Sequence, residues 1–396
     1  MTKKPVSRGL AAVIIALLFV AYTAIYIARL NLAAASVPLE AAGKLTTAQY
    51  GIVAGLFSVV YALGRFFNGA LCDRLHPAIT ISAGLGLCAL GNILFGFSAS
   101  YGQMLVLWGV NACAQSLIWS SVLRVTVALY PPAKAQTVSS YMLMSVAAGN
   151  IGSLIVNARL INAYGWRYAF LVPGAIVLVL AVVAVLLLPR VPVEPMPKKE
   201  HKGLIGIFKE KQIRQALIPM TLYGAIKDNV SAFVFQFLAA VYAVNLKDSG
   251  LWAALIPTAG LVGRLLYPFV RKALRKREFL LCTYGFLGTA AVTIPLFFRV
   301  PMAVSVVCLA LIYTATSMVN TTAAVFAVRF ASTGDVATVS GLMDLCAYSG
   351  CAVGSVLYGY LIPLLGFKAM FAVWLALALI SAVLLHPLRK SEGLRF

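Results

Sequence analysis

Long apolar segments separated by short polar connections recur along the 396-residue chain. Each segment has about 20 residues or more, enough for a helix to cross a hydrocarbon core of ~30 Å. Because most connections are very short, consecutive helices are expected to run antiparallel. The pattern therefore predicts an all-α integral membrane fold of twelve transmembrane helices, at residues 9–38, 47–71, 78–97, 102–130, 136–163, 167–189, 216–245, 250–272, 279–298, 303–331, 337–363 and 367–386.

One connection differs from the others. Residues 190–215 are rich in proline, lysine and glutamate, and they divide the apolar segments into two sets of six. We therefore expect an N-terminal six-helix bundle at 1–189, a cytoplasmic linker at 190–215 and a C-terminal six-helix bundle at 216–396.

Composition excludes a soluble globular protein, since 62% of the residues are hydrophobic, 11% are charged and the mean hydropathy is +0.93. The net charge of +21 would suggest a nucleic-acid partner on a soluble protein. Here the basic residues gather at one set of segment ends, which predicts cytoplasmic N and C termini by the positive-inside rule. We expect a multi-pass protein of the cell (inner) membrane that contacts lipid and binds no nucleic acid.

Catalytic and metal-binding patterns are missing from the sequence. The seven cysteines form no CxxC pair, the three histidines are far apart, and neither a Ser/His/Asp set nor a phosphate-binding P-loop occurs. We therefore expect no enzyme, no catalytic residue, no metal and no cofactor. The first apolar segment is too long for the core of a signal peptide and is interpreted as a retained span.

The two halves of the chain resemble one another. Gly64-Arg65 recurs as Gly263-Arg264 at an offset of 199, and Thr137-Val138-Ser139 recurs as Thr338-Val339-Ser340 at an offset of 201. A near-constant offset over most of the chain indicates a parallel repeat. Two six-helix halves in parallel repeat are the architecture of the major facilitator superfamily.

An arginine lies inside the first apolar segment, where a charge is costly and calls for a reason. Helical spacing places Tyr22, Tyr26 and Arg29 on one face, which suits a water-filled cavity better than lipid. The repeat offset of about 199 leads from Arg29 to the position beside Lys227 in the seventh span. In this architecture the first and seventh spans line the central cavity, so the two cations predict an anion site. The alternative is a structural arginine bonded to nearby carbonyl groups.

Several motifs resemble those of the organophosphate:phosphate antiporter family. The resemblance covers essentially the whole chain. It rests on Tyr22, Tyr26, Arg29 and Asn31 in the first span, Tyr61 and Arg65 in the second, the loop Cys72–Pro77, Trp119 and Arg124 in the fourth, Lys227 in the seventh, and Tyr313 and Tyr348 in the tenth and eleventh. It implies a secondary transporter that exchanges an organophosphate for phosphate and usually works as a monomer.

The chain also departs from this family. Ser145 stands where the glycerol-phosphate and hexose-phosphate carriers have a substrate-binding histidine, and Lys227 stands where an arginine is expected. Asp344 adds a carboxylate to the eleventh span. The resemblance to this family therefore does not identify the substrate of this chain.

Phosphate recognition would use both cations. Arginine offers a planar fork for two phosphate oxygens, and lysine acts as a mobile point charge. We expect Arg29 and Lys227 to bridge one anion between the halves, which would favour obligatory exchange by alternating access. The remaining substrate-binding candidates are Tyr22, Tyr26, Tyr61, Arg65, Ser145, Tyr313 and Tyr348.

Two carboxylates leave the coupling open. Asp344 either forms a salt bridge with Arg329 or Lys227, or is protonated in a proton-coupled symporter of an organic carboxylate or other anion. Asp228 follows Lys227 directly and is expected to point about 100° away from it, toward a cation of a neighbouring helix. A further alternative is a transporter-like membrane sensor of sugar phosphate, since the family's fold also serves as a receptor.

Overall fold

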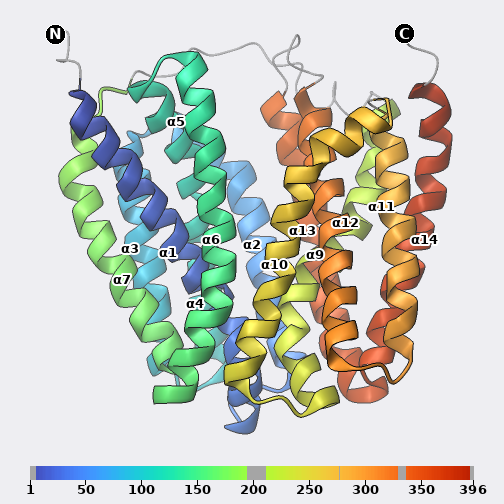
Figure 1. Ribbon diagram of the computed structural model, residues 1–396. Helices are drawn as coiled ribbons and strands as arrows, with labels where there is room; N and C mark the ends of the chain where they lie inside the picture. The colour runs from blue at the N-terminus through green and yellow to red at the C-terminus, as the bar shows by residue number, and fades with distance from the viewer. Residues whose placement is uncertain (1–5, 194–210, 276, 329–335, 393–396) are drawn as a thin grey trace. The chain divides into compact units, whose positions relative to one another are not determined.

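The structure is a computed structural model that describes residues 6–193, 211–275, 277–328 and 336–392 (Figure 1). Its long elements are α-helices, as a chain in lipid requires to satisfy its own backbone polar groups. They are α1 (Arg8–Ala41), α2 (Thr47–Arg74), α3 (Pro77–Phe97), α4 (Tyr101–Ser116), α5 (Ile118–Leu129), α6 (Pro132–Tyr164), α7 (Tyr168–Leu187), α9 (Lys211–Tyr242), α10 (Leu246–Ala273), α11 (Glu278–Thr293), α12 (Met302–Val328), α13 (Val336–Leu365) and α14 (Phe367–Glu392).

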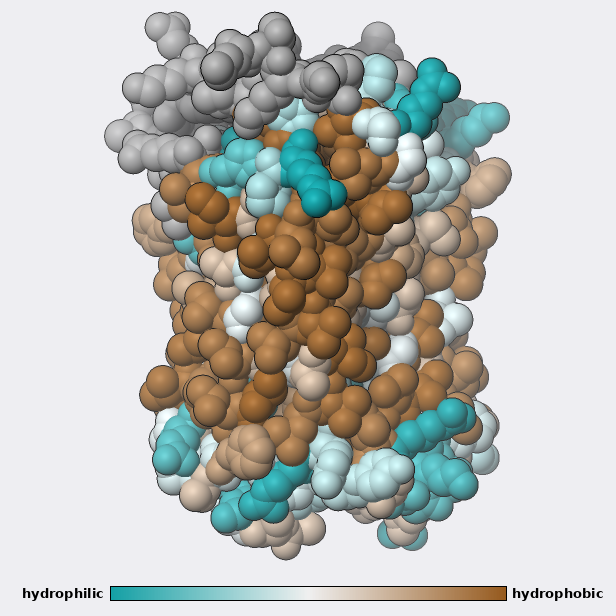
Figure 2. Space-filling view, turned by 90° about the vertical axis from the view of Figure 1, so that its left-hand side faces the viewer, coloured by the Kyte–Doolittle hydropathy of each residue, from teal (hydrophilic) through white to brown (hydrophobic). Residues whose placement is uncertain are grey.

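Membrane-spanning helices account for the predicted apolar segments. Eleven helical stretches among the described residues are long and apolar enough to cross a membrane, and one of them combines α4 and α5. The remaining predicted span, 216–245, corresponds to α9, which has 32 residues and carries the polar run Lys227-Asp228-Asn229. On the face drawn in Figure 2, hydrophobic side chains form a broad belt with hydrophilic residues above and below it. The all-α, multi-pass membrane prediction is confirmed, whereas the orientation of the termini stays a prediction.

The helices form two compact units. The first comprises Met1–Leu45 and Val60–Pro197, and the second comprises Thr46–Val59 and Lys198–Phe396. The beginning of α2 is thus grouped with the second unit, where the Tyr50 hydroxyl donates to the carbonyl of Ala232 in α9.

In the first unit, α1 and α6 pack closely along the face that precedes Arg29. A Cβ atom on Gly149 of α6 would lie 2.8 Å from the carbonyl oxygen of Thr23 in α1, so only glycine allows this approach. One turn further along, the Ser153 hydroxyl and the Asn157 amide both donate to the carbonyl of Ile27. These bonds fix α1 next to α6 just before Arg29.

In the second unit, α9 and α13 cross in the equivalent way. A Cβ atom on Gly350 of α13 would overlap the carbonyl of Thr221 in α9. The Ser355 hydroxyl then donates to Oδ1 of Asn229, whose amide donates to the carbonyl of Cys351. The glycine recurs at an offset of 201 and the serine at an offset of 202, so each half packs its first helix against the corresponding glycine. The serine bonds differ, since Ser153 donates to a backbone carbonyl and Ser355 donates to a side-chain amide oxygen.

Candidate functional site

Arg29 lies against two tyrosine rings in the first unit. Its Cζ atom is 4.5 Å from the ring centroid of Tyr61 in α2 and 5.5 Å from that of Tyr26 in α1. The Tyr22 ring is 5.5 Å from Tyr26 and 5.0 Å from Trp119 of α5. The predicted face of Tyr22, Tyr26 and Arg29 is therefore present, and Trp119 extends its aromatic wall.

A second arginine shares the Tyr61 ring. Cζ of Arg65 lies 5.9 Å from the ring centroid of Tyr61, so one aromatic ring contacts two guanidinium groups. Tyr61 is almost fully buried, whereas both arginines are half-buried. Cations held against an aromatic face are stabilised by about 0.5–2 kcal/mol. The first unit thus combines two positive charges with hydroxyl groups, as an anion site requires.

Lys227 is the corresponding cation of the second unit, in the middle of α9. Its Nζ atom lies 2.6 Å from Oδ1 of Asp228 and 5.5 Å from the ring centroid of Tyr313 in α12. Tyr223 of the same helix and Arg264 of α10 also interact with it electrostatically, the arginine by repulsion between like charges. The side chain of Lys227 is 11% exposed and that of Asp228 is 36% exposed. This cluster brings a buried cation, a carboxylate and two phenol groups together.

The Lys227–Asp228 pair differs from the expectation for Asp228. Side chains of adjacent helical residues project about 100° apart, which predicts that Asp228 reaches a neighbouring helix. The structure pairs the two neighbours, because the four-carbon stem of lysine can bend along the helix surface, and a contact of Asp228 with a neighbouring helix stays a prediction. An acidic residue directly after a buried lysine was the available signal for this pairing.

Ser145 belongs to the contact between α1 and α6. Its hydroxyl donates to the carbonyl of Met142 in the same helix, and its carbonyl accepts a bond from the Thr23 hydroxyl at 3.4 Å. The residue is fully buried. A direct contact between Ser145 and substrate stays a prediction.

Tyr348 and Asp344 lie one turn apart on α13, and both are half-buried. Of the two salt-bridge partners expected for Asp344, Lys227 is paired with Asp228, and Arg329 lies outside the described residues. The roles expected for Tyr348 and Asp344 stay predictions.

Two further polar residues of the matched motifs have structural positions. The guanidinium of Arg124 in α5 donates to the carbonyls of Cys72 and Leu75, at the end of α2. The amide of Asn31 donates to Asn92 of α3 and to the carbonyl of Ala169 in α7. Both side chains hold helices together, so the bonds of Arg124 make it a helix-end partner in this structure.

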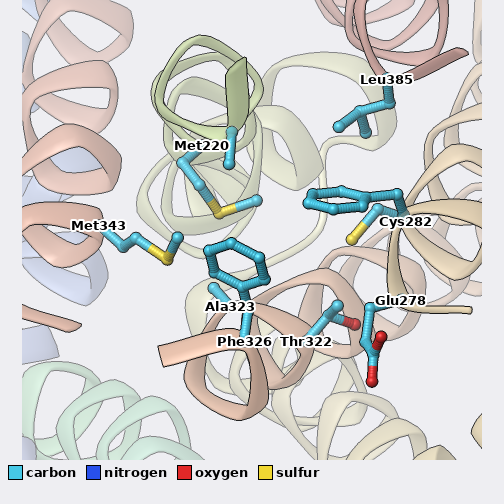
Figure 3. A pocket seen from close by; sticks show the side chains of 10 residues that line it. Met220, Glu278, Cys282, Thr322, Ala323, Phe326, Met343 and Leu385 are labelled. Carbon is cyan, nitrogen blue, oxygen red and sulfur yellow. The ribbon is translucent and has the colours of Figure 1, made fainter. Parts of the chain in front are cut away.

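A pocket in the second unit lies apart from the Lys227 cluster. Ten side chains from α9, α11, α12, α13 and α14 line it, and most are apolar (Figure 3). The carboxylate of Glu278 reaches its edge and is bonded to Arg271 at 2.7 Å. Since neither Lys227 nor Tyr313 is among the lining residues, this pocket is not the candidate anion site.

Comparison with known proteins indicates a transporter fold. The sequence profile of the Major Facilitator Superfamily matches residues 14–355. The chain is 23% identical over 290 residues to a "Probable hexose phosphate transport protein" of Chlamydia trachomatis, covering 65% of this chain and 64% of that protein. It is 31% identical over 159 residues to the "Membrane sensor protein UhpC" of Salmonella typhimurium, covering 40% of this chain and 36% of that protein.

Among solved structures, a bacterial homologue of the human lysosomal transporter Spinster, in an inward-facing and occupied conformation, has a TM-score of 0.76 to this chain. It is 16% identical, and the match covers 97% of this chain and 96% of that protein. The likeness establishes the fold. The two curated relatives are matched over 64% and 36% of their own length.

Proposed function

Since the chain belongs to the Major Facilitator Superfamily, we propose that it is a secondary transporter of a small organic anion, and that it exchanges an organophosphate for inorganic phosphate by alternating access. The observation that supports this proposal most directly is that Arg29 and Lys227 occupy equivalent positions in the two repeats, each against a tyrosine ring. A cation inside a membrane protein is costly and therefore marks a candidate binding position; Asp228 already neighbours Lys227, so a substrate anion would share that cation with the carboxylate.

The chemistry of the two cations fits a phosphate group. Arg29 supplies up to two parallel hydrogen bonds to phosphate oxygens, and Lys227 supplies a point charge that can follow the anion. In the proposed cycle each unit contributes one cation to the same anion. The bound anion then offsets the repulsion between the cations, so that switching is favoured with substrate and disfavoured without it. Such a mechanism gives exchange rather than leak and needs no nucleotide.

The names of the relatives support the substrate class. One is named as a hexose phosphate transport protein, and its match to this chain extends over 290 residues. Transport of a phosphorylated sugar or related organophosphate by this chain is therefore the proposal with most support, and it is consistent with a transport role rather than catalysis.

Counterflow in proteoliposomes tests the proposal. Vesicles loaded with phosphate should take up labelled phosphate or sugar phosphate without a pH gradient. Arg29→Ala and Lys227→Ala should each abolish uptake while the protein still inserts, and Lys227→Arg should retain part of the activity. Wild-type flux in Arg29→Ala or Lys227→Ala would refute the two-cation mechanism.

A sensor is the second candidate, because one relative is named a membrane sensor protein and is 31% identical over the matched region. Binding of sugar phosphate by the purified protein, combined with no flux in the counterflow assay, would favour the sensor. Uptake that requires an inward proton gradient, and that disappears in Asp344→Asn, would instead indicate a proton-coupled symporter.

A further inference from the structure

A tyrosine from another helix contacts each cation, but that helix differs between the two units. In the first unit, Tyr61 of α2 lies against Arg29. In the second unit, Tyr313 of α12 lies against Lys227. The repeat offset of 199 takes Tyr61 to Gly260 of α10, which has no side chain. The ring that contacts the cation has therefore moved from one helix of the repeat to another.

Close contacts of two glycines support the correspondence of α2 with α10 in the repeat. Gly64 and Gly263 are related by the same offset. A Cβ atom on Gly64 would overlap the side chain of Ser116 in α4, and a Cβ atom on Gly263 would lie 3.0 Å from the carbonyl of Thr314 in α12. Corresponding helices thus meet at corresponding glycines, three residues after Tyr61 in one unit and three after Gly260 in the other.

The missing side chain at position 260 is what makes room for the Tyr313 ring. A Cβ atom on Gly260 would lie 2.5 Å from Cδ1 and 2.6 Å from Cε1 of that ring. Separations below about 3 Å require an atom to move, and Tyr313 is 6% exposed and so has little free space around it. Gly260 is helical, so the reason for glycine here is the close approach of the ring and not backbone conformation.

We propose that Gly260 is a positioning residue that holds Tyr313 against Lys227, and that Tyr313 thereby does for Lys227 what Tyr61 does for Arg29. The electron-rich ring face attracts the ammonium group and restricts the rotamers of a flexible side chain. The ammonium group is then ordered before an anion arrives, which lowers the entropy lost on binding. This inference rests on the proposed anion-binding role of Lys227 and adds a residue that touches neither substrate nor cation.

Phosphate binding to the purified, reconstituted protein provides the first test. In Gly260→Ala the added methyl group displaces the ring, and the apparent affinity for phosphate should fall by about twofold to thirtyfold, the range expected for one cation–π contact. The maximal exchange rate should change less than KM. Gly263→Ala is the matched control, since its methyl group meets Thr314 instead of Tyr313. Equal losses in both variants would overturn the inference, because simple helix packing would then explain them.

Moving the ring back provides a second test. Tyr313→Ala removes the ring and should weaken phosphate binding as Gly260→Ala does, whereas Tyr313→Phe keeps the ring and should bind nearly as wild type does. Adding Gly260→Tyr to Tyr313→Ala places the ring on α10, as in the first unit, and should recover part of the affinity. A folded double variant with no recovery would count against the positional equivalence.

A spectroscopic readout separates this inference from the proposed function. In protein labelled with 13Cε-lysine, the Lys227 signal can be assigned from its loss in Lys227→Arg. The ring current of Tyr313 should shift this signal upfield, and Gly260→Ala and Tyr313→Leu should both remove the shift while Gly263→Ala keeps it. If the chemical shift of Lys227 is the same in Gly260→Ala, Tyr313→Leu and the wild type, the inference is overturned. A signal that responds as expected, in a protein that binds no phosphate, would refute the anion-binding proposal alone.

Discussion

In the second unit, Nζ of Lys227 lies 2.6 Å from Oδ1 of Asp228, its immediate neighbour along α9. The pair is a charge-assisted hydrogen bond between a largely buried ammonium group and a more exposed carboxylate. An anion that binds Lys227 must therefore compete with Asp228 or bind beside it. Under the proposed function, the carboxylate is therefore expected to affect the strength of anion binding at this cation.

Asp228→Asn should strengthen phosphate binding, because the amide keeps the size of the side chain and removes its negative charge. If the competing carboxylate weakens phosphate binding by about 1.4 kcal/mol, its removal lowers the dissociation constant for phosphate tenfold. The measurement is displacement of labelled phosphate from detergent-solubilised protein.

The control for charge alone is Asp248→Asn. Asp248 is bonded to Asn245 at the beginning of α10, and its loss removes the same charge from the same unit. Weaker phosphate binding in Asp228→Asn, with no change in Asp248→Asn, would show that the carboxylate holds Lys227 in place for the substrate and does not compete with it.

Arg29→Lys should reduce exchange by about tenfold or more, although the charge is retained. A lysine lacks the planar fork that binds two phosphate oxygens, and it stacks less well on the rings of Tyr26 and Tyr61. The initial rate of phosphate counterflow, normalised to inserted protein, is the measurement. Lys227→Arg is the reciprocal variant, and a loss there as large as in Arg29→Lys would mean that the two cations do not have different roles.

Helical periodicity and the repeat predicted much of this molecule. The apolar segments predicted the membrane spans, because a helix of about 20 apolar residues matches the thickness of the hydrocarbon core. The four-residue and three-residue spacings placed Tyr22, Tyr26 and Arg29 on one face, and these side chains do lie together. Such relations depend only on the geometry of a single helix, which the sequence specifies locally.

Contacts between helices could not be predicted from the sequence to the same extent. The contact of Tyr313 with Lys227 depends on how α9, α10 and α12 pack, and the space at Gly260 becomes meaningful only once that packing is known. The pairing of Lys227 with Asp228 depends on a side-chain rotamer, which helical periodicity alone does not give. A glycine at the place of Tyr61 in the repeat was the signal in the sequence that could have drawn attention to position 260.

Asp344→Asn should leave phosphate exchange independent of a pH gradient and close to the wild-type rate. The proposed cycle is driven by exchange of anions, so a neutral side chain on α13 removes no required proton carrier. The measurement compares counterflow in vesicles with and without an inward proton gradient. If wild-type uptake follows the gradient and the variant loses that dependence, Asp344 carries the proton and exchange is not the mechanism.

Gly350→Val should strongly destabilise the second unit. A Cβ atom at this position would overlap the carbonyl of Thr221, and neither backbone can retreat without opening the contact between α9 and α13. We expect destabilisation of about 3 kcal/mol or more, at the upper end of the range for overpacking. Gly341→Val in the same helix is the control, since a Cβ atom there meets nothing within 4 Å. Thermal unfolding in detergent should separate the two variants, and equal melting temperatures would contradict the crossing.

Arg271→Ala should destabilise the second unit through Glu278. Both Nε and Nη2 of Arg271 donate to Oε1 of Glu278, and the glutamate side chain is 1% exposed while that of Arg271 is 31% exposed. Removing the arginine leaves a buried carboxylate without this partner, which costs about 3–5 kcal/mol when a buried pair is broken from one side. Lys272→Ala removes an exposed charge one residue away and should have little effect. The double variant Arg271→Ala/Glu278→Gln should melt at a higher temperature than Arg271→Ala, because the amide is neutral. If the single and double variants melt together, the destabilisation comes from lost packing of the arginine stem and not from the unpaired carboxylate.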